Sequence, residues 1–184
     1  PEKNGHTFAK DLVEQIVKMN HGTYLDESLE NSACTDFNIG VAGYPEKHME
    51  AASLEQDIYH LKKKVEAGAD YIVTQMFFDN QKYYDFVEKC RTSGINVPII
   101  PGLKPITTKS QLSMIPHRFK VDLPNELVIA IAKAKDNKEV KEIGINWCIQ
   151  QSKDLMKNGA PVLHYYSMGK SEVVKRIASE VFKD

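Results

Sequence analysis

The amino-acid sequence predicts an α/β protein built around a parallel β-sheet. Two observations lead to this fold class: four short segments rich in β-branched and aromatic residues, and amphipathic helical stretches between them. Strands that alternate with helices form right-handed βαβ units, in which neighbouring strands are parallel. The chain has 184 residues, enough for one domain or for part of a larger one. Four such strands fit either a small open sheet or one half of an eight-stranded (β/α) barrel.

The four predicted strands are short and lack a clean alternation of apolar and polar residues. They are Phe37–Gly43, Tyr71–Phe78, Val97–Leu103 and Val162–Ser167. Nearly continuous apolar runs of this length are typical of parallel strands that are buried on both sides. We therefore expect both faces of the sheet to be covered.

The helix between the first two strands has the clearest pattern. Within Ser53–Ala67, apolar residues that include Ile58 and Leu61 recur at helical spacing. Ser53, followed three residues later by Gln56, predicts a capping box at the helix start. The other predicted helices are Phe8–Met19, Asn80–Ser93, Thr108–Ile115, Asn125–Lys135, Glu139–Lys157 and Lys170–Phe182. The opening helix has no strand before it to pack against, and residues 20–35 are polar and predicted to be a loop.

Composition and charge argue against several classes of function. The chain has 24 Lys and Arg against 25 Asp and Glu, so the net charge of −1 does not suggest a nucleic-acid surface. No apolar run approaches the ~20 residues of a membrane span. Cys34, Cys90 and Cys148 match no zinc spacing, so no metal site is expected. Three thiols in a chain of this size indicate a reducing compartment, which we take to be the cytoplasm.

Two common nucleotide-binding motifs are absent. The segment Gly169-Lys170-Ser171 is similar to the end of a P-loop, but His164 stands where the earlier glycine is required. The sequence also contains no GxGxxG fingerprint of a Rossmann dinucleotide site. What remains is a helix that begins directly after the fourth strand, and its N-terminus can accept an anionic group.

Candidate ligand-binding residues lie at the carboxyl ends of the strands, where α/β folds bind ligands. Gln75 is the most prominent, because it is a polar residue inside the apolar run Ile72–Phe78. Its amide either pairs within the core or hydrogen-bonds a flat heterocycle through its donor and acceptor together. Gln111 follows Thr108 by three residues, which is also the spacing of a capping box.

A second group of candidates lies on the helix after the first strand. Asp57, His60 and Lys64 share one face of that helix, and Lys63 stands beside it. A carboxylate here can accept hydrogen bonds from ribose hydroxyls, while the lysines can meet phosphate. The same spacing is typical of a solvated charged face, so both interpretations remain open at this point.

The residues at these strand ends resemble the methylenetetrahydrofolate reductase family. The resemblance covers the chain from Phe8 to the C-terminus and rests on several motifs at family spacing. They are Val41-Ala42-Gly43-Tyr44-Pro45-Glu46-x-His48-x-Glu50-Ala51, Leu61-Lys62-x-Lys64-Val65-x-Ala67-Gly68-Ala69-Asp70, Thr74-Gln75-x-Phe77-Phe78-Asp79, Pro101-Gly102-x-x-Pro105-Ile106 and His164-x-Tyr166-Ser167.

The resemblance implies a (β/α)8 TIM barrel, with residues 1–184 supplying roughly strands five to eight of one FAD-binding domain. The family passes hydride from NAD(P)H through FAD to methylenetetrahydrofolate, giving methyltetrahydrofolate. Carried onto this sequence, the FAD-contacting positions are Tyr44, His48, Ala51, Asp57, His60, Lys63 and Lys64. The folate and nicotinamide positions are Gln75, Gln111, Tyr166, Met168 and Lys170. Gln75 is the position that contacts both the nicotinamide and the pterin ring in turn.

Two parts of the family pattern have no counterpart in this sequence. The general-acid glutamate near the first strand and the Arg-Gly-Asp segment at the end of the fourth are absent. We therefore expect a C-terminal half of the barrel that is inactive without its other half, from an enzyme that is a homo-oligomer when complete. The alternative is a non-catalytic half-barrel that binds or assembles with a partner through its unpaired edges.

Overall fold

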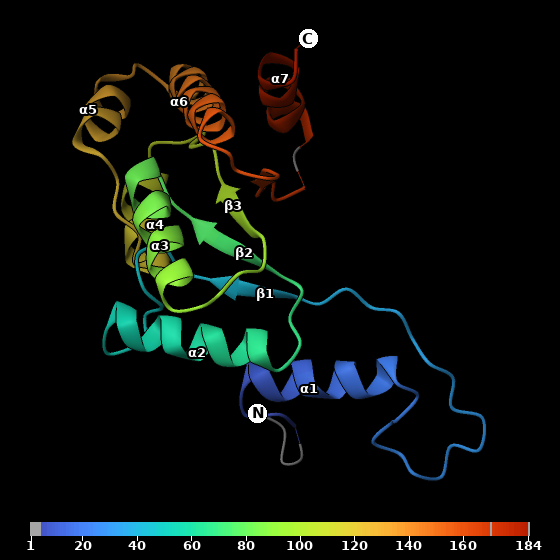
Figure 1. Ribbon diagram of the computed structural model, residues 1–184. Helices are drawn as coiled ribbons and strands as arrows, with labels where there is room; N and C mark the ends of the chain where they lie inside the picture. The colour runs from blue at the N-terminus through green and yellow to red at the C-terminus, as the bar shows by residue number, and fades with distance from the viewer. Residues whose placement is uncertain (1–4, 170, 184) are drawn as a thin grey trace.

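The computed structural model describes residues 5–169 and 171–183 and has the predicted α/β architecture (Figure 1). Four strands alternate with helices along the chain. The strands are β1 (Gly40–Gly43), β2 (Tyr71–Met76), β3 (Ile99–Leu103) and β4 (His164–Tyr165). The helices are α1 (Ala9–Asn20), α2 (Leu54–Glu66), α3 (Asn80–Thr92), α4 (Gln111–Phe119), α5 (Asn125–Lys133), α6 (Asn137–Lys157) and α7 (Ser171–Val181).

The sheet is parallel throughout, and its strands lie in the order of the sequence, β1-β2-β3-β4. Each new strand is therefore added on the same side of the previous one. With right-handed crossovers, such an order places every connecting helix on the same face of the sheet. The observed packing agrees, since α1, α2, α3, α6 and α7 contact one another in that order.

One core lies between this helical layer and the sheet. Val41, Ile72 and Ile99 point from three strands into it, and they pack with Phe86 of α3 and Ile177 of α7. The expectation that both faces would be covered is wrong. Burial alternates along β1 and β2, and the residues of the opposite face are exposed or half-buried. The reason is topological, because all the layer helices stand on one side.

A second apolar cluster closes the carboxyl end of the sheet. Met76 and Phe78 at the end of β2 pack there with Ile115 of α4 and Ile131 of α5. Helix α6 anchors the same end, because the Trp147 indole donates to the carbonyl of Phe78 at 3.0 Å. The loops that follow β2 and β3 are thus held by packed helices.

Several predicted elements differ from the structure in extent; β2 ends at Met76 and not at Phe78, and β3 begins at Ile99 and not at Val97. The first strand begins at Gly40 and not at Phe37, whose backbone N–H and carbonyl are both bonded by the Asn20 side chain instead. The fourth strand shrinks to His164–Tyr165. Helix α4 runs from Gln111 to Phe119, later than predicted, and tolerates Pro116 in its interior. The predicted Ser53 cap is confirmed, since its hydroxyl accepts from the N–H of Gln56. The predicted capping box is incomplete, because Oε1 of Gln56 accepts from the N–H of Ala52 and not from that of Ser53.

No helix within residues 5–169 and 171–183 is long and apolar enough to cross a membrane.

Candidate functional site

Two tyrosines stand beyond the carboxyl ends of the edge strands β1 and β4. Tyr44 follows β1 and Tyr166 follows β4. Burial raises the pKa of the Tyr166 phenol, and the nearby Tyr44 phenol raises it further. The Tyr166 side chain reaches across the sheet, because its hydroxyl donates to the carbonyl of Thr74 in β2 at 2.8 Å.

The loop after β1 is organised around Asp57. The Asp57 carboxylate, in the first turn of α2, accepts from the backbone N–H of His48 at 2.8 Å. The His48 ring in turn stands edge-on to the Tyr44 ring, with centroids 4.6 Å apart. Burial raises the pKa of Tyr44, with smaller contributions from Asp57 and Glu50. Three of the predicted FAD-contacting residues are thus brought into one connected group.

Lys64 joins this group from the other end of α2. Its ammonium donates to the carbonyl of Ala42 at 2.8 Å. That carbonyl points away from β2, because strand carbonyls alternate and the carbonyl of Ile39, three residues earlier, accepts from Tyr71 on the β2 side. Burial lowers the pKa of Lys64, while the charge of Asp57 partly restores it. The lysine therefore provides a half-buried positive charge beside β1.

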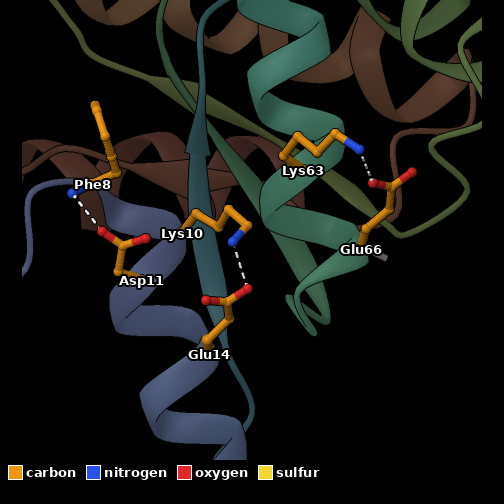
Figure 2. A network of polar contacts seen from close by, with 6 residues as sticks. All are labelled: Phe8, Lys10, Asp11, Glu14, Lys63 and Glu66. Carbon is orange, nitrogen blue, oxygen red and sulfur yellow. Dashed lines mark hydrogen bonds and ion pairs between the residues drawn. The ribbon is translucent and has the colours of Figure 1, made fainter.

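The remaining residues predicted on this side make contacts other than with Asp57. The Lys63 ammonium pairs with Glu66 at 2.8 Å, and Figure 2 shows the two side chains directed to each other along α2. The exposed His60 ring contacts only the Tyr59 ring among the described residues, at a centroid distance of 5.5 Å. Ala51 is half-buried, and its carbonyl accepts from the Lys47 ammonium at 2.5 Å.

Gln75 lies in β2 on the open face and is half-buried rather than enclosed. Its Oε1 accepts from the N–H of the next residue, Met76, at 3.0 Å. It makes no bond to the neighbouring strand, so the interpretation as a core glutamine paired within the sheet is not what the structure shows. Within the described part of the chain its Nε2 has no partner, which leaves two N–H donors for a ligand.

An irregularity in the sheet surrounds Gln75. Val73 pairs with Ile100 and Met76 with Gly102, so two residues of β2, Thr74 and Gln75, stand opposite Pro101 alone. This is a β-bulge, with one extra residue in β2 relative to β3.

Three predicted residues lie at the far side of the site. Oε1 of Gln111 accepts from the backbone N–H groups of Thr107 and Thr108, so its side chain holds the loop after β3. Met168 is 79% exposed and adopts a left-handed backbone conformation, with φ of 51°. Lys170 lies outside the described residues.

Two residues of the site escaped the sequence analysis. Thr74 is fully buried in the bulge, and the Pro101-Gly102 pair inside a central strand was the signal that could have revealed it. Glu46 follows β1, and its carboxylate accepts from the N–H of Asp122 at 2.9 Å. Burial raises the pKa of Glu46 to about 7. Among the described residues no group of three or more His, Cys, Asp or Glu side chains is placed to hold a metal ion.

Comparison with known proteins agrees with this arrangement. A family model described as methylenetetrahydrofolate reductase matches residues 1–181. The chain belongs to the methylenetetrahydrofolate reductase family. The resemblance seen in the strand-end motifs is thereby confirmed over nearly the whole sequence.

Relatives in this family come from fungi, plants and bacteria. Methylenetetrahydrofolate reductase 1 of Schizosaccharomyces pombe is 36% identical over 176 residues, which cover 95% of this chain and 27% of that protein. Methylenetetrahydrofolate reductase (NADH) 1 of Arabidopsis thaliana is 37% identical, over 90% of this chain and 28% of that protein. The Salmonella typhimurium 5,10-methylenetetrahydrofolate reductase is 34% identical, over 75% of this chain and 47% of that protein. The chain thus spans between about a quarter and a half of these relatives.

A solved structure shares the fold. It is an uncharacterized protein from Clostridium thermocellum that binds two copies of 5-methyl-5,6,7,8-tetrahydrofolic acid. The TM-score is 0.51 and the sequence identity 19%, and the match covers 79% of this chain and 52% of that one. At this identity the likeness establishes the fold alone.

Proposed function

We propose that the protein is an FAD-dependent methylenetetrahydrofolate reductase that takes hydride from a nicotinamide nucleotide. The single observation that carries the proposal is the placement of Gln75. Its carboxamide stands on the open face of the sheet near the carboxyl ends of the strands, with Nε2 uncommitted within the described chain. A carboxamide there can donate to and accept from the flat polar edge of a pterin or of a nicotinamide.

The residues around α2 fit an FAD. Asp57 bonds the His48 N–H through Oδ2, and no described residue donates to its Oδ1, so this oxygen can accept from a ribose hydroxyl. Lys64 supplies a positive charge for the diphosphate, and the Tyr44 and His48 rings provide aromatic surface beside it. FAD, when bound, supplies the two-electron chemistry that links nicotinamide to folate. The protein's part is to hold the flavin ring against the nicotinamide or the folate ring and to exclude water.

The architecture supports a half-barrel for residues 1–184. Strands in sequential order, all parallel, with every layer helix on one face, are the pattern of a (β/α)8 barrel and not of a doubly wound sheet. In such a barrel the open face, which bears Ala42, Val73 and Gln75, becomes the interior. Alternating burial on β1 and β2 follows directly, since the interior face is completed by other strands.

The hydride donor and the cellular compartment are proposed from two further observations. The names of the relatives specify NADH in Arabidopsis thaliana and NADPH in Caenorhabditis elegans, which supports a nicotinamide nucleotide without choosing between them. Cys34, Cys90 and Cys148 are free thiols, in keeping with a cytoplasmic location.

The first experiment replaces Gln75 in the complete enzyme. We expect Gln75→Ala to lower kcat/KM for methylenetetrahydrofolate by about 100-fold, because orientation of the reacting rings is lost. The matched control is Gln150→Ala, which removes an exposed carboxamide on α6. Equal turnover of Gln75→Ala and wild type would exclude Gln75 from the site. Absence of folate turnover in the wild type would reject the proposed function as a whole.

A second experiment addresses the FAD side without using turnover. We expect Asp57→Asn to weaken FAD retention by about tenfold in equilibrium dialysis, because a charged acceptor for ribose is lost. Asp36→Asn, an exposed carboxylate without a described partner, is the control. Unchanged retention in Asp57→Asn would remove this residue from the cofactor site.

A further inference from the structure

At the bulge opposite Pro101, side chains form hydrogen bonds with three backbone groups. The N–H of Gly102 donates to the Thr74 hydroxyl at 2.9 Å. The Tyr166 hydroxyl donates to the Thr74 carbonyl at 2.8 Å. The N–H of Met76 donates to Oε1 of Gln75 at 3.0 Å. Three side chains thus hold the backbone of the bulge, and one of them is Gln75, which we place against the substrate.

Gly102 makes this arrangement possible. A Cβ at Gly102 would lie 2.2 Å from the Thr74 carbonyl oxygen and 2.7 Å from Cε2 of Tyr166. The Tyr166 ring therefore crosses β3 at the one residue without a side chain. This is how a residue that follows β4 reaches the backbone of β2, two strands away.

The burial of these hydrogen bonds makes their geometry stiff. Thr74 is fully buried, and Tyr166 is half-buried within the cluster that contains Met76. Buried backbone groups without partners cost stability, so the bulge cannot relax without losing these bonds. The direction of the Gln75 backbone is consequently set by Thr74 and Tyr166, and its amide is anchored through Met76.

We infer that Thr74 and Tyr166 are positioning residues for Gln75, acting through the β2 bulge, with Gly102 as the position that lets them meet. The inference rests on the proposed function for the role of Gln75 toward folate. It changes the expected role of Tyr166, because the hydroxyl that would contact a ligand is already donated to the Thr74 carbonyl.

The test uses Thr74→Val, which keeps the branched shape and removes the hydroxyl, and Thr74→Ser, which keeps the hydroxyl. In the complete enzyme, we expect Thr74→Val to raise the Kd for 5-methyltetrahydrofolate by about tenfold, and Thr74→Ser by less than about twofold. On a Gln75→Ala background, Thr74→Val is expected to add less than about twofold, because its effect passes through Gln75. An equal factor on both backgrounds, or equal damage from Ser and Val, would overturn the inference.

A second measurement is independent of folate. The side-chain amide signals of Gln75 in a ¹⁵N–¹H NMR spectrum, assigned by their loss in Gln75→Ala, are expected to shift in Thr74→Val and in Tyr166→Phe but not in Thr74→Ser. Tyr166→Phe keeps the ring packing, so it serves if Thr74→Val does not fold. Unmoved Gln75 signals in Tyr166→Phe would refute the inference. If the wild type neither binds nor reduces folate, the proposed function fails while these signals still decide the positioning role.

Discussion

Helix α6 contains a glycine whose replacement separates tertiary packing from helix propensity. Gly144 is buried in the middle of the helix, and a Cβ there would lie 1.8 Å from the carbonyl oxygen of Ile106. Carbon and oxygen atoms in close contact are normally about 3.3 Å apart, so helix and loop would have to separate by about 1.5 Å. The obstacle is backbone, which cannot rotate out of the way as a side chain would.

We therefore expect Gly144→Ala to destabilise the protein, although helix propensity alone predicts that it stabilises the helix. Helix propensity favours alanine over glycine by about 1 kcal/mol. Overpacking against a rigid neighbour costs about 1–3 kcal/mol, and this contact belongs at the upper end. We expect a net loss of about 2 kcal/mol in the free energy of unfolding, or a Tm lower by about 4–8 °C.

Thermal unfolding followed by circular dichroism or calorimetry measures this loss directly. Asn146→Ala is the matched control, because it places alanine at an exposed position of the same helix, two residues away. Propensity predicts a small gain there, below about 1 kcal/mol. A Tm for Gly144→Ala equal to or above that of the wild type would refute the packing argument.

Two further predictions concern buried polar groups. The pKa of Glu46 in the folded protein is about 7, above its ordinary value of 4.5. The stability that the protonated carboxyl contributes is therefore fully present below about pH 4.5 and is lost as the pH rises to 7. Glu46→Gln should therefore gain stability relative to wild type between pH 5 and pH 8 in urea unfolding. Parallel pH profiles for wild type and Glu46→Gln would contradict this. Tyr83→Phe removes the buried hydroxyl that donates to the Ile99 carbonyl at 2.7 Å, and should lower the free energy of unfolding by about 1–2 kcal/mol. Chemical denaturation checks this loss, and an unchanged midpoint would count against the bond.

The strands and helices could be predicted because their signals are local. The helical spacing of Ile58 and Leu61 and the cap at Ser53 were read correctly from neighbouring residues, and α2 has both. The strand boundaries were less accessible, since Phe37 is removed from the sheet by Asn20, a residue 17 positions away. Hydrogen bonds over such separations leave no periodic trace in a sequence.

The candidate site was predictable in composition but not in connectivity. Motif resemblance named Asp57, Lys64 and Gln75, and the structure places Asp57 with His48 and Lys64 beside β1. The resemblance also named Lys63, and the motifs gave no indication that its ammonium pairs with Glu66.

The amino-acid pattern was sufficient for the α/β class, the parallel strands and the family, because each depends on short-range periodicity or on motif residues. Only the tertiary structure shows the uncovered face of the sheet, the bulge at Thr74 and the contact of Gly144 with Ile106. They arise where segments far apart in the chain meet, and the fit of two surfaces is a property of neither segment alone. Pro101 and Gly102 mark such a meeting, but only the approach of Tyr166 from β4 shows what the glycine is for.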